Sequence, residues 1–186
     1  MLMDITLPVT PEMLGTAWNN TAKSLVGHLG THFDVMDKEF PLGYTQRKAV
    51  VFDVSAVKNR DITASDIDLS LVEADMFVAF YTGYITQVPY GTPEYFKAHP
   101  QLSQELIGQL LDKGISIIGL DCAGIRRTPE HVPADQRCAD RGVFVIENLY
   151  DLDTLLSVTQ KFTARTYPMR LSGITGLPCR VVAQID

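Results

Sequence analysis

Apolar residues along the chain occur in short blocks that are separated by Gly, Pro or small polar residues. Four blocks are rich in β-branched and aromatic residues and have the length of buried strands. They cover residues 49–54, 76–81, 115–120 and 143–146. Two more strands are predicted at 161–171 and 179–185, joined by the Gly-containing loop 172–176.

Capping residues predict helices between these strands. Ser or Thr before a helical stretch and Pro at its first position mark starts, and Gly after the last turn marks an end. The predicted helices begin at Thr10-Pro11 and run toward Asn20, begin at the capping pattern Thr63-Ala64-Ser65-Asp66, run from Ser103 to Lys113 before Gly114, and run from Pro133 to Gly142.

Helices that alternate with strands indicate an α/β fold, and the last two strands favour some antiparallel pairing. The sequence has no repeat, low-complexity tract or linker, and its 186 residues suffice to bury a core. We therefore expect residues 1–186 to form one domain.

The composition limits the classes of function. Hydrophobic residues make up 46% and charged residues 20%, an ordinary balance for a globular protein. The net charge of −6 argues against binding to nucleic acid or to an anionic membrane. The first residues lack the pattern of a signal peptide, and the odd, scattered Cys122, Cys138 and Cys179 favour reduced thiols. We expect a cytoplasmic protein in which Cys122 is a small buried hydrophobic residue rather than a nucleophile.

The stretch His28-Leu29-Gly30-Thr31-His32-Phe33-Asp34 contains two of the four histidines and a nearby carboxylate. Imidazoles and a carboxylate oxygen are ligands for Zn²⁺ or Mn²⁺. A straight strand would hold His28 and His32 roughly 13 Å apart, too far for one ion. We expect the chain to bend at Gly30, which lacks a Cβ. Two partly buried histidines at a turn are the alternative.

Polar residues follow several predicted strands, where α/β sheets gather ligands. Asp121 is interpreted first as a loop cap that accepts backbone N–H bonds. Glu147 interrupts an apolar strand, so a metal, an arginine or a solvent channel has to offset its buried charge.

Aromatic residues gather near the same strand ends. Tyr84, Tyr95 and Phe96, together with Thr82, are candidates to bind a planar substrate, and packing of the loop is an equally weighted alternative. His99 precedes a proline and is expected to be a solvated loop residue. His131 is near enough in sequence to Asp135 to turn toward the site if its loop folds back.

Several motifs together resemble the cyclase family of metal-dependent hydrolases, which includes kynurenine formamidase and isatin hydrolase. The histidine stretch resembles the family signature His-x-Gly-Thr-His-x-Asp. Further matches occur in the same order at Tyr81-Thr82-Gly83-Tyr84, Gly91-Thr92-Pro93-Glu94-Tyr95-Phe96, His99-Pro100-Gln101-Leu102-Ser103, Gly119-Leu120-Asp121 and Val145-Ile146-Glu147-Asn148-Leu149.

The resemblance implies a swivelling β/β/α fold with a mixed sheet and flanking helices, assembled as a homodimer or homotetramer. It implies divalent Zn or Mn held by His28, His32, Asp34 and Glu147. Two positions depart from the family pattern. Asp135 stands where many members have a metal-binding histidine, and Lys38 stands where they have a histidine proposed to transfer protons.

The resulting hypothesis is a hydrolase that uses metal-activated water to cleave a small cyclic or formylated amide, as an arylformamidase does. His28, His32, Asp34, Glu147 and Asp135 would hold the metal. Lys38 would protonate the leaving nitrogen, provided that its pKa of about 10.4 were lowered. A surface pair with Asp37 or Glu39 is the alternative for Lys38. The alternative function is a non-catalytic member of the family that binds a small ligand.

Overall fold

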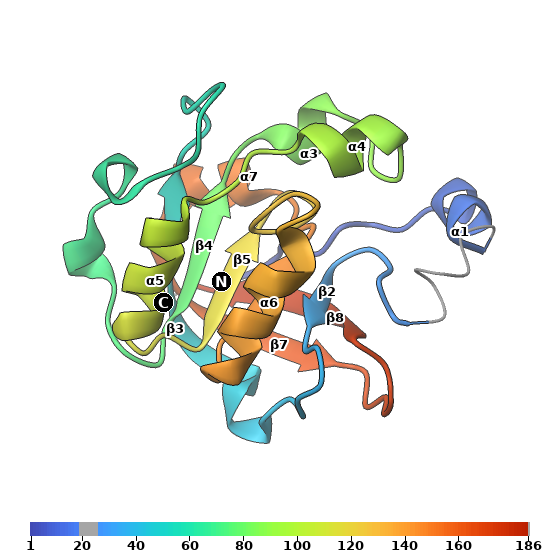
Figure 1. Ribbon diagram of the computed structural model, residues 1–186. Coiled ribbons are helices and arrows are strands. Elements are labelled where there is room, and N and C mark those ends of the chain that lie inside the picture. The colour runs from blue at the N-terminus through green and yellow to red at the C-terminus, as the bar shows by residue number, and fades with distance from the viewer. Residues whose placement is uncertain (19–25, 186) are drawn as a thin grey trace.

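The computed structural model describes residues 1–18 and 26–185 (Figure 1). The strands are β1 (Leu2–Asp4), β2 (His32–Asp34), β3 (Gln46–Asp53), β4 (Phe77–Tyr81), β5 (Ile117–Leu120), β6 (Phe144–Glu147), β7 (Lys161–Pro168) and β8 (Gly176–Gln184). The helices are α1 (Pro11–Trp18), α3 (Tyr84–Gln87), α4 (Pro93–Ala98), α5 (Gln104–Asp112), α6 (His131–Asp140) and α7 (Leu152–Val158). Short 3₁₀ segments cover Leu42–Thr45, Ala64–Asp66 and Leu69–Leu71. None of these helices is long and apolar enough to cross a membrane.

The strands form a mixed sheet that closes into a barrel. Their order is β1-β8-β2-β6-β5-β4-β3-β7, and β7 also pairs with β8. Strands β3, β4, β5 and β6 are mutually parallel, whereas β2, β7 and β8 join by antiparallel pairings. Seven strands therefore form the closed barrel, and β1 extends from β8 outside it. The expected α/β class is confirmed, including antiparallel pairing of the last two strands.

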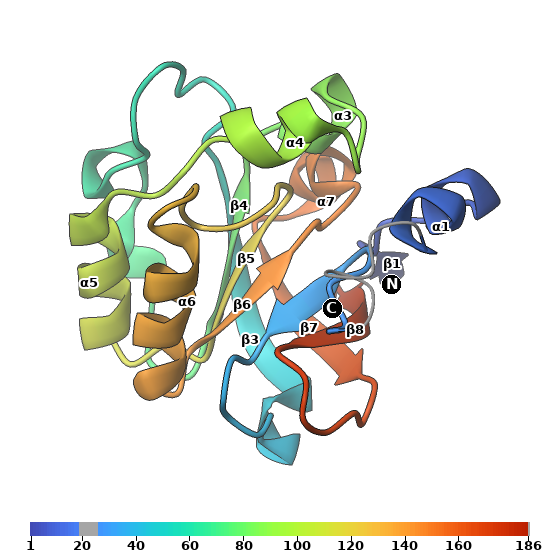
Figure 2. The same cartoon turned by 45° about the vertical axis from the view of Figure 1, so that its right-hand side comes forward.

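Alternation along the strands creates two apolar cores. On β3 and β4, Val51 and Ala79 face the barrel interior, whereas Val50 and Val78 face the helices. Both sets are fully buried, so these strands read as continuous apolar runs. Figure 2 shows α5 and α6 side by side over the outer core.

Most predicted elements occur with shifted ends. Ser103 caps α5 by accepting a bond from the Leu106 N–H, and Gly114 follows the helix with φ +70°. The capping pattern at 63–66 forms a 3₁₀ turn with a capping box. Helix α6 begins at His131, two residues before the predicted start at Pro133. Helix α1 is described as far as Trp18, and the predicted end near Asn20 lies outside the described residues.

Candidate metal centre

Strand β2 presents two candidate ligands on the outer face of the barrel. Since side chains alternate along a strand, His32 and Asp34 share one face and Phe33 points into the barrel core. Across the ladder, His32 lies directly opposite Glu147 of β6. Residues opposite each other in an antiparallel pair face the same way, so Glu147 lies beside His32. His32 Nε2 is 3.6 Å from Glu147 Oε2.

A bend at Gly30 brings His28 to the same place. Gly30 has φ +59°, and a Cβ there would lie 2.7 Å from Val9 Cγ2. The expected bend at this glycine is confirmed. His28 Nδ1 lies 3.1 Å from Asp34 Oδ1 and 3.1 Å from His32 Nε2. The bend thereby avoids the separation of roughly 13 Å that a straight strand would impose between His28 and His32.

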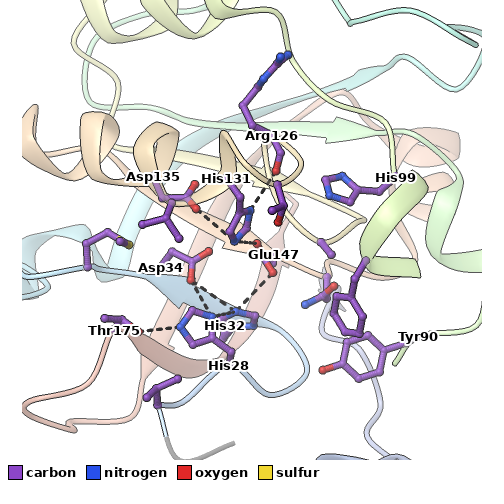
Figure 3. Close-up of a pocket in the computed structure, with 17 residues that line it drawn as sticks. His28, His32, Asp34, Tyr90, His99, Arg126, His131, Asp135, Glu147 and Thr175 are labelled. Atoms are coloured by element: carbon purple, nitrogen blue, oxygen red, sulfur yellow. Dashed lines mark hydrogen bonds and ion pairs between the residues drawn. The ribbon is translucent and has the colours of Figure 1, made fainter. Parts of the chain in front are cut away.

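Helix α6 covers this face and contributes two more groups (Figure 3). His131 and Asp135 are one helical turn apart, and the His131 Nε2 atom is 3.5 Å from Asp135 Oδ2. The same nitrogen is 3.6 Å from Glu147 Oε1. Gly124 makes room for this ring, because a Cβ there would lie 2.5 Å from His131 Nδ1.

Each of the three imidazoles is held on its outer nitrogen by a hydrogen bond. His32 Nδ1 is 2.8 Å from the Gly30 carbonyl oxygen, and His131 Nδ1 is 3.1 Å from the Arg126 carbonyl oxygen. A carbonyl only accepts, so both Nδ1 atoms carry the proton and both Nε2 atoms of the neutral rings present a lone pair inward. His28 Nε2 lies 2.9 Å from Thr175 Oγ1, which leaves its Nδ1 directed at Asp34. Such outer contacts orient metal-binding histidines.

The carboxylates of Asp34 and Asp135 are both buried. Asp34 Oδ1 faces His28 Nδ1, whereas Asp34 Oδ2 and Asp135 Oδ1 accept no hydrogen bond from a described residue. Burial raises the pKa of Asp135 well above its ordinary value, and the neighbouring charge of Asp34 raises it further. Burial also acts to raise the pKa of Asp34, but His28, His32 and His131 together lower it.

A divalent cation fits this set of donors. Its charge would offset the buried carboxylates, and its empty orbitals would accept the inward lone pairs. Two groups of ligand atoms lie within 4.8 Å of one another, His28, His32 and Asp34 in one and Asp34, His131 and Asp135 in the other. Asp34 belongs to both groups, so the residues present could hold one ion or two.

The ligand groups open into a cavity of about 380 Å³. Tyr90 and Phe96 line part of it, and all four histidines of the chain line it as well. Arg126 also lines the cavity, but its guanidinium forms ion pairs with Asp61 and Glu130. This positive charge is thus engaged away from the carboxylates of the centre.

Lys38 lies away from the cavity, contrary to the predicted role as proton donor. Its Nζ is 3.1 Å from Asp37 Oδ1 and 2.9 Å from Asp140 Oδ1 at the end of α6. Hydrogen bonds to Asp140 and Asp37 raise its pKa, whereas the predicted role needs a lowered one. The backbone turns back after β2, where Met36 has φ +54°, and Met36 rather than Lys38 lines the cavity. The alternative of a surface pair with Asp37 is what the structure contains.

Of the predicted substrate-binding residues, Phe96 lines the cavity, whereas Thr82, Tyr84 and Tyr95 are not among its described lining residues. The Tyr84 hydroxyl donates to the Glu94 carbonyl. The fully buried Tyr95 donates to Asn148 Oδ1. Thr82 donates through its backbone N–H and its hydroxyl to Asp121 Oδ1. The contacts of these three residues are those of the alternative in which they pack the loop.

Asp121 and Cys122 have the structural roles expected from the sequence. Asp121 accepts bonds from the N–H groups of Thr82 and Gly83, which fastens the ends of β4 and β5 together. Cys122 is fully buried, and burial raises its pKa well above the usual value for a thiol.

Two histidines have a larger place in the cavity than their sequence context indicated. His131 was expected to reach the site only if its loop folded back, but it lies within α6 and reaches Glu147. His99 was expected to be solvated, yet it is 1% exposed and lines the cavity. For His131, the i, i+4 spacing to Asp135 was the signal available in the sequence. The residues next to His99 in the sequence gave no signal that it would line the cavity.

The fold and the site define an α/β barrel protein with a candidate histidine–carboxylate metal centre. The chain belongs to the family named Putative cyclase, whose sequence profile matches residues 3–126. No curated protein matches the chain.

Solved structures share the fold over nearly the whole chain. A potential metal-dependent hydrolase with cyclase activity has 23% identity and a TM-score of 0.73, covering 98% of this chain and 96% of its own. A predicted metal-dependent hydrolase from Bacillus stearothermophilus has 22% identity and a TM-score of 0.72, with 98% and 97% coverage. Isatin hydrolase A from Labrenzia aggregata, bound to benzyl benzoate, has 22% identity and a TM-score of 0.68, with 83% and 72% coverage.

Proposed function

We propose that this protein is a metal-dependent hydrolase that cleaves the C–N bond of a small cyclic or formylated amide. The observation that carries the proposal is the convergence of three oriented imidazoles on buried carboxylates, of which Asp34 Oδ2 and Asp135 Oδ1 accept no hydrogen bond from a described residue. Holding such a set together without a cation would cost several kcal/mol. The names of the structural neighbours support the same class of reaction.

Zn²⁺ and Mn²⁺ both suit this mixture of imidazole and carboxylate donors. His28, His32 and Asp34 would hold one ion, and Asp34, His131 and Asp135 a second, with Glu147 beside both. When bound, such an ion supplies positive charge that polarises a carbonyl group and acidifies water.

The rest of the cavity suits a small, partly apolar substrate. Tyr90 and Phe96 offer aromatic surface, and Val132 and Met36 offer aliphatic surface. A volume of about 380 Å³ admits a molecule of one or two rings. The buried carboxylates disfavour anions near the centre unless a cation is present.

Metal content per chain is the test. Protein dialysed without chelator and reloaded with Zn²⁺ or Mn²⁺ is compared with His32→Ala by elemental analysis. We expect near-stoichiometric metal in the wild type and a large loss in the variant. Lys38→Met is the matched control, since its side chain lies outside the cavity, and it should retain metal. Formanilide and small lactams are then screened as substrates.

A non-catalytic, ligand-binding protein is the second candidate. The position of Lys38 favours it, because the residue that stands at the family's proton-transfer position faces Asp37 and Asp140 instead of the cavity. Stoichiometric metal without hydrolysis of any amide would support this candidate. Absence of metal under every loading condition would contradict both a metal-dependent hydrolase and a ligand site built on the metal.

A further inference from the structure

His99 is the histidine of the cavity that does not belong to either candidate ligand group. It follows α4 and precedes Pro100, with the extended backbone (φ −60°, ψ 151°) that a residue before proline adopts. Its 1% exposure is similar to the 1% of Asp34 and the 2% of His32. Figure 3 shows its ring projecting into the cavity from the side opposite His28. His99 is therefore as deeply buried as the candidate ligands and lines the same cavity.

The His99 ring is held in a defined orientation. Its Nδ1 lies 2.8 Å from the Pro100 carbonyl oxygen, and because a carbonyl only accepts, Nδ1 carries the proton. Nε2 is then the nitrogen that can gain or lose a proton. The Tyr84 ring packs 6.5 Å away, centroid to centroid. The following segment is fixed by bonds from the Leu102 N–H to the Ile125 carbonyl and from the Ser103 N–H to the Ile62 carbonyl.

Hydrolysis of an amide needs a proton donor, because an amine leaves poorly as an anion. Lys38 lies outside the cavity. The Tyr90 hydroxyl lines the cavity and accepts a bond from the Gly30 N–H, but burial raises its pKa further above neutrality. Arg126 is occupied by Asp61 and Glu130. Among the described lining residues outside the ligand groups, His99 is the side chain whose ordinary pKa lies near neutral pH.

We propose that His99 is the catalytic proton donor of this chain. The inference rests on the proposed hydrolase function. His99 acts in its doubly protonated form: as the C–N bond breaks, the leaving nitrogen takes the proton from His99 Nε2, which leaves a neutral ring with its proton on Nδ1. The oxygen of one water molecule forms the new bond to the carbonyl carbon, and a proton from that water returns to His99. The sum of these steps is amide plus water giving acid plus amine.

A comparison of leaving groups tests this role. Formanilide releases a poor leaving group that needs protonation, whereas 4-nitrophenyl formate releases a phenolate that does not. We expect His99→Gln to lower kcat for formanilide by about 100-fold or more and to leave the rate for 4-nitrophenyl formate within roughly threefold. His99→Asn should behave in the same way. Lys38→Met should match the wild type on both substrates.

Metal content and melting temperature are measured for every variant. Equal losses on both substrates, or loss of metal from His99→Gln, would mean that His99 is a ligand or a structural residue and would overturn the proposal. An unchanged rate on formanilide would also overturn it. If metal-loaded wild type hydrolyses neither substrate, the hydrolase function fails first, and His99 as donor fails with it.

Discussion

His32 on β2 and Glu147 on β6 lie directly opposite each other in the barrel, with His32 Nε2 3.6 Å from Glu147 Oε2. The pairing joins residues that are far apart in sequence. It also places Glu147 between the two ligand groups, because its other oxygen is 3.6 Å from His131 Nε2. The register of one short antiparallel ladder thus sets the geometry of the whole centre.

Gly30→Ala should weaken the centre and the fold together. The positive φ of Gly30 disfavours a side chain, and the added Cβ would lie 2.7 Å from Val9 Cγ2. We expect a loss of about 1–2 kcal/mol in the free energy of unfolding and lower metal affinity, because His28 moves. Gly43→Ala is the control, since nothing lies within 4 Å of its Cβ position. Equal urea midpoints and metal affinities for the two variants would contradict the prediction.

His131→Ala should separate the two ligand groups. The variant keeps His28, His32 and Asp34 but removes the imidazole of the second group. If both groups bind metal, elemental analysis should give about one equivalent less per chain than the wild type, or a 10–100-fold weaker second affinity by titration calorimetry. His28→Ala should affect the other affinity instead. Loss of all metal in His131→Ala would indicate a single ion shared by every ligand.

The pH dependence of stability should contain a contribution from Asp121. Burial raises its pKa from 3.8 to about 6, so between these values the folded state binds more protons than the unfolded chain. Its contribution to stability is therefore present below about pH 4 and is lost as the pH rises through about 6, by about 3 kcal/mol in total.

Asp121→Asn provides the comparison for this prediction. We expect the stability of the wild type, relative to the variant, to fall between pH 4.5 and pH 7 in urea unfolding. If the relative stability rose instead, the hydrogen bonds from Thr82 and Gly83 would dominate and would hold the carboxylate ionised.

The cysteines should resist thiol reagents in the native state. Cys122, Cys138 and Cys179 are buried and free. Burial raises the pKa of Cys138 to about 12, and that of Cys179 higher still. At pH 8 only about one Cys138 thiol in 10⁴ is ionised, so reaction with a disulfide reagent should await unfolding. Fast native labelling of even one thiol per chain would contradict this prediction, with urea-unfolded protein as the reference for complete reaction.

The local sequence determined the elements and one half of the candidate site. Apolar runs with bounding turn residues specify β3, β4, β5 and β6, because burial on both faces requires continuous apolar strands. Ser103 specifies the start of α5 through a bond to a residue three positions away. His28, His32 and Asp34 lie within seven residues, and the bend that joins them needs only the freedom of Gly30. The residues involved are close together in the sequence, so these features can be recognised without knowledge of the tertiary structure.

The tertiary structure decided the other half, because it depends on contacts between distant segments. Pairing of β7 with both β3 and β8 closes the barrel, and no single segment encodes that closure. The start of α6 at His131 directs that imidazole toward Glu147, and the turn after β2 sends Lys38 to Asp140 at the surface. His99 enters the cavity because the loop after α4 packs onto the outer core. The first ligand group can thus be recognised within one short stretch of sequence. Packing between distant segments brings in His131 and Asp135 of the second group and His99, the residue proposed to donate the proton.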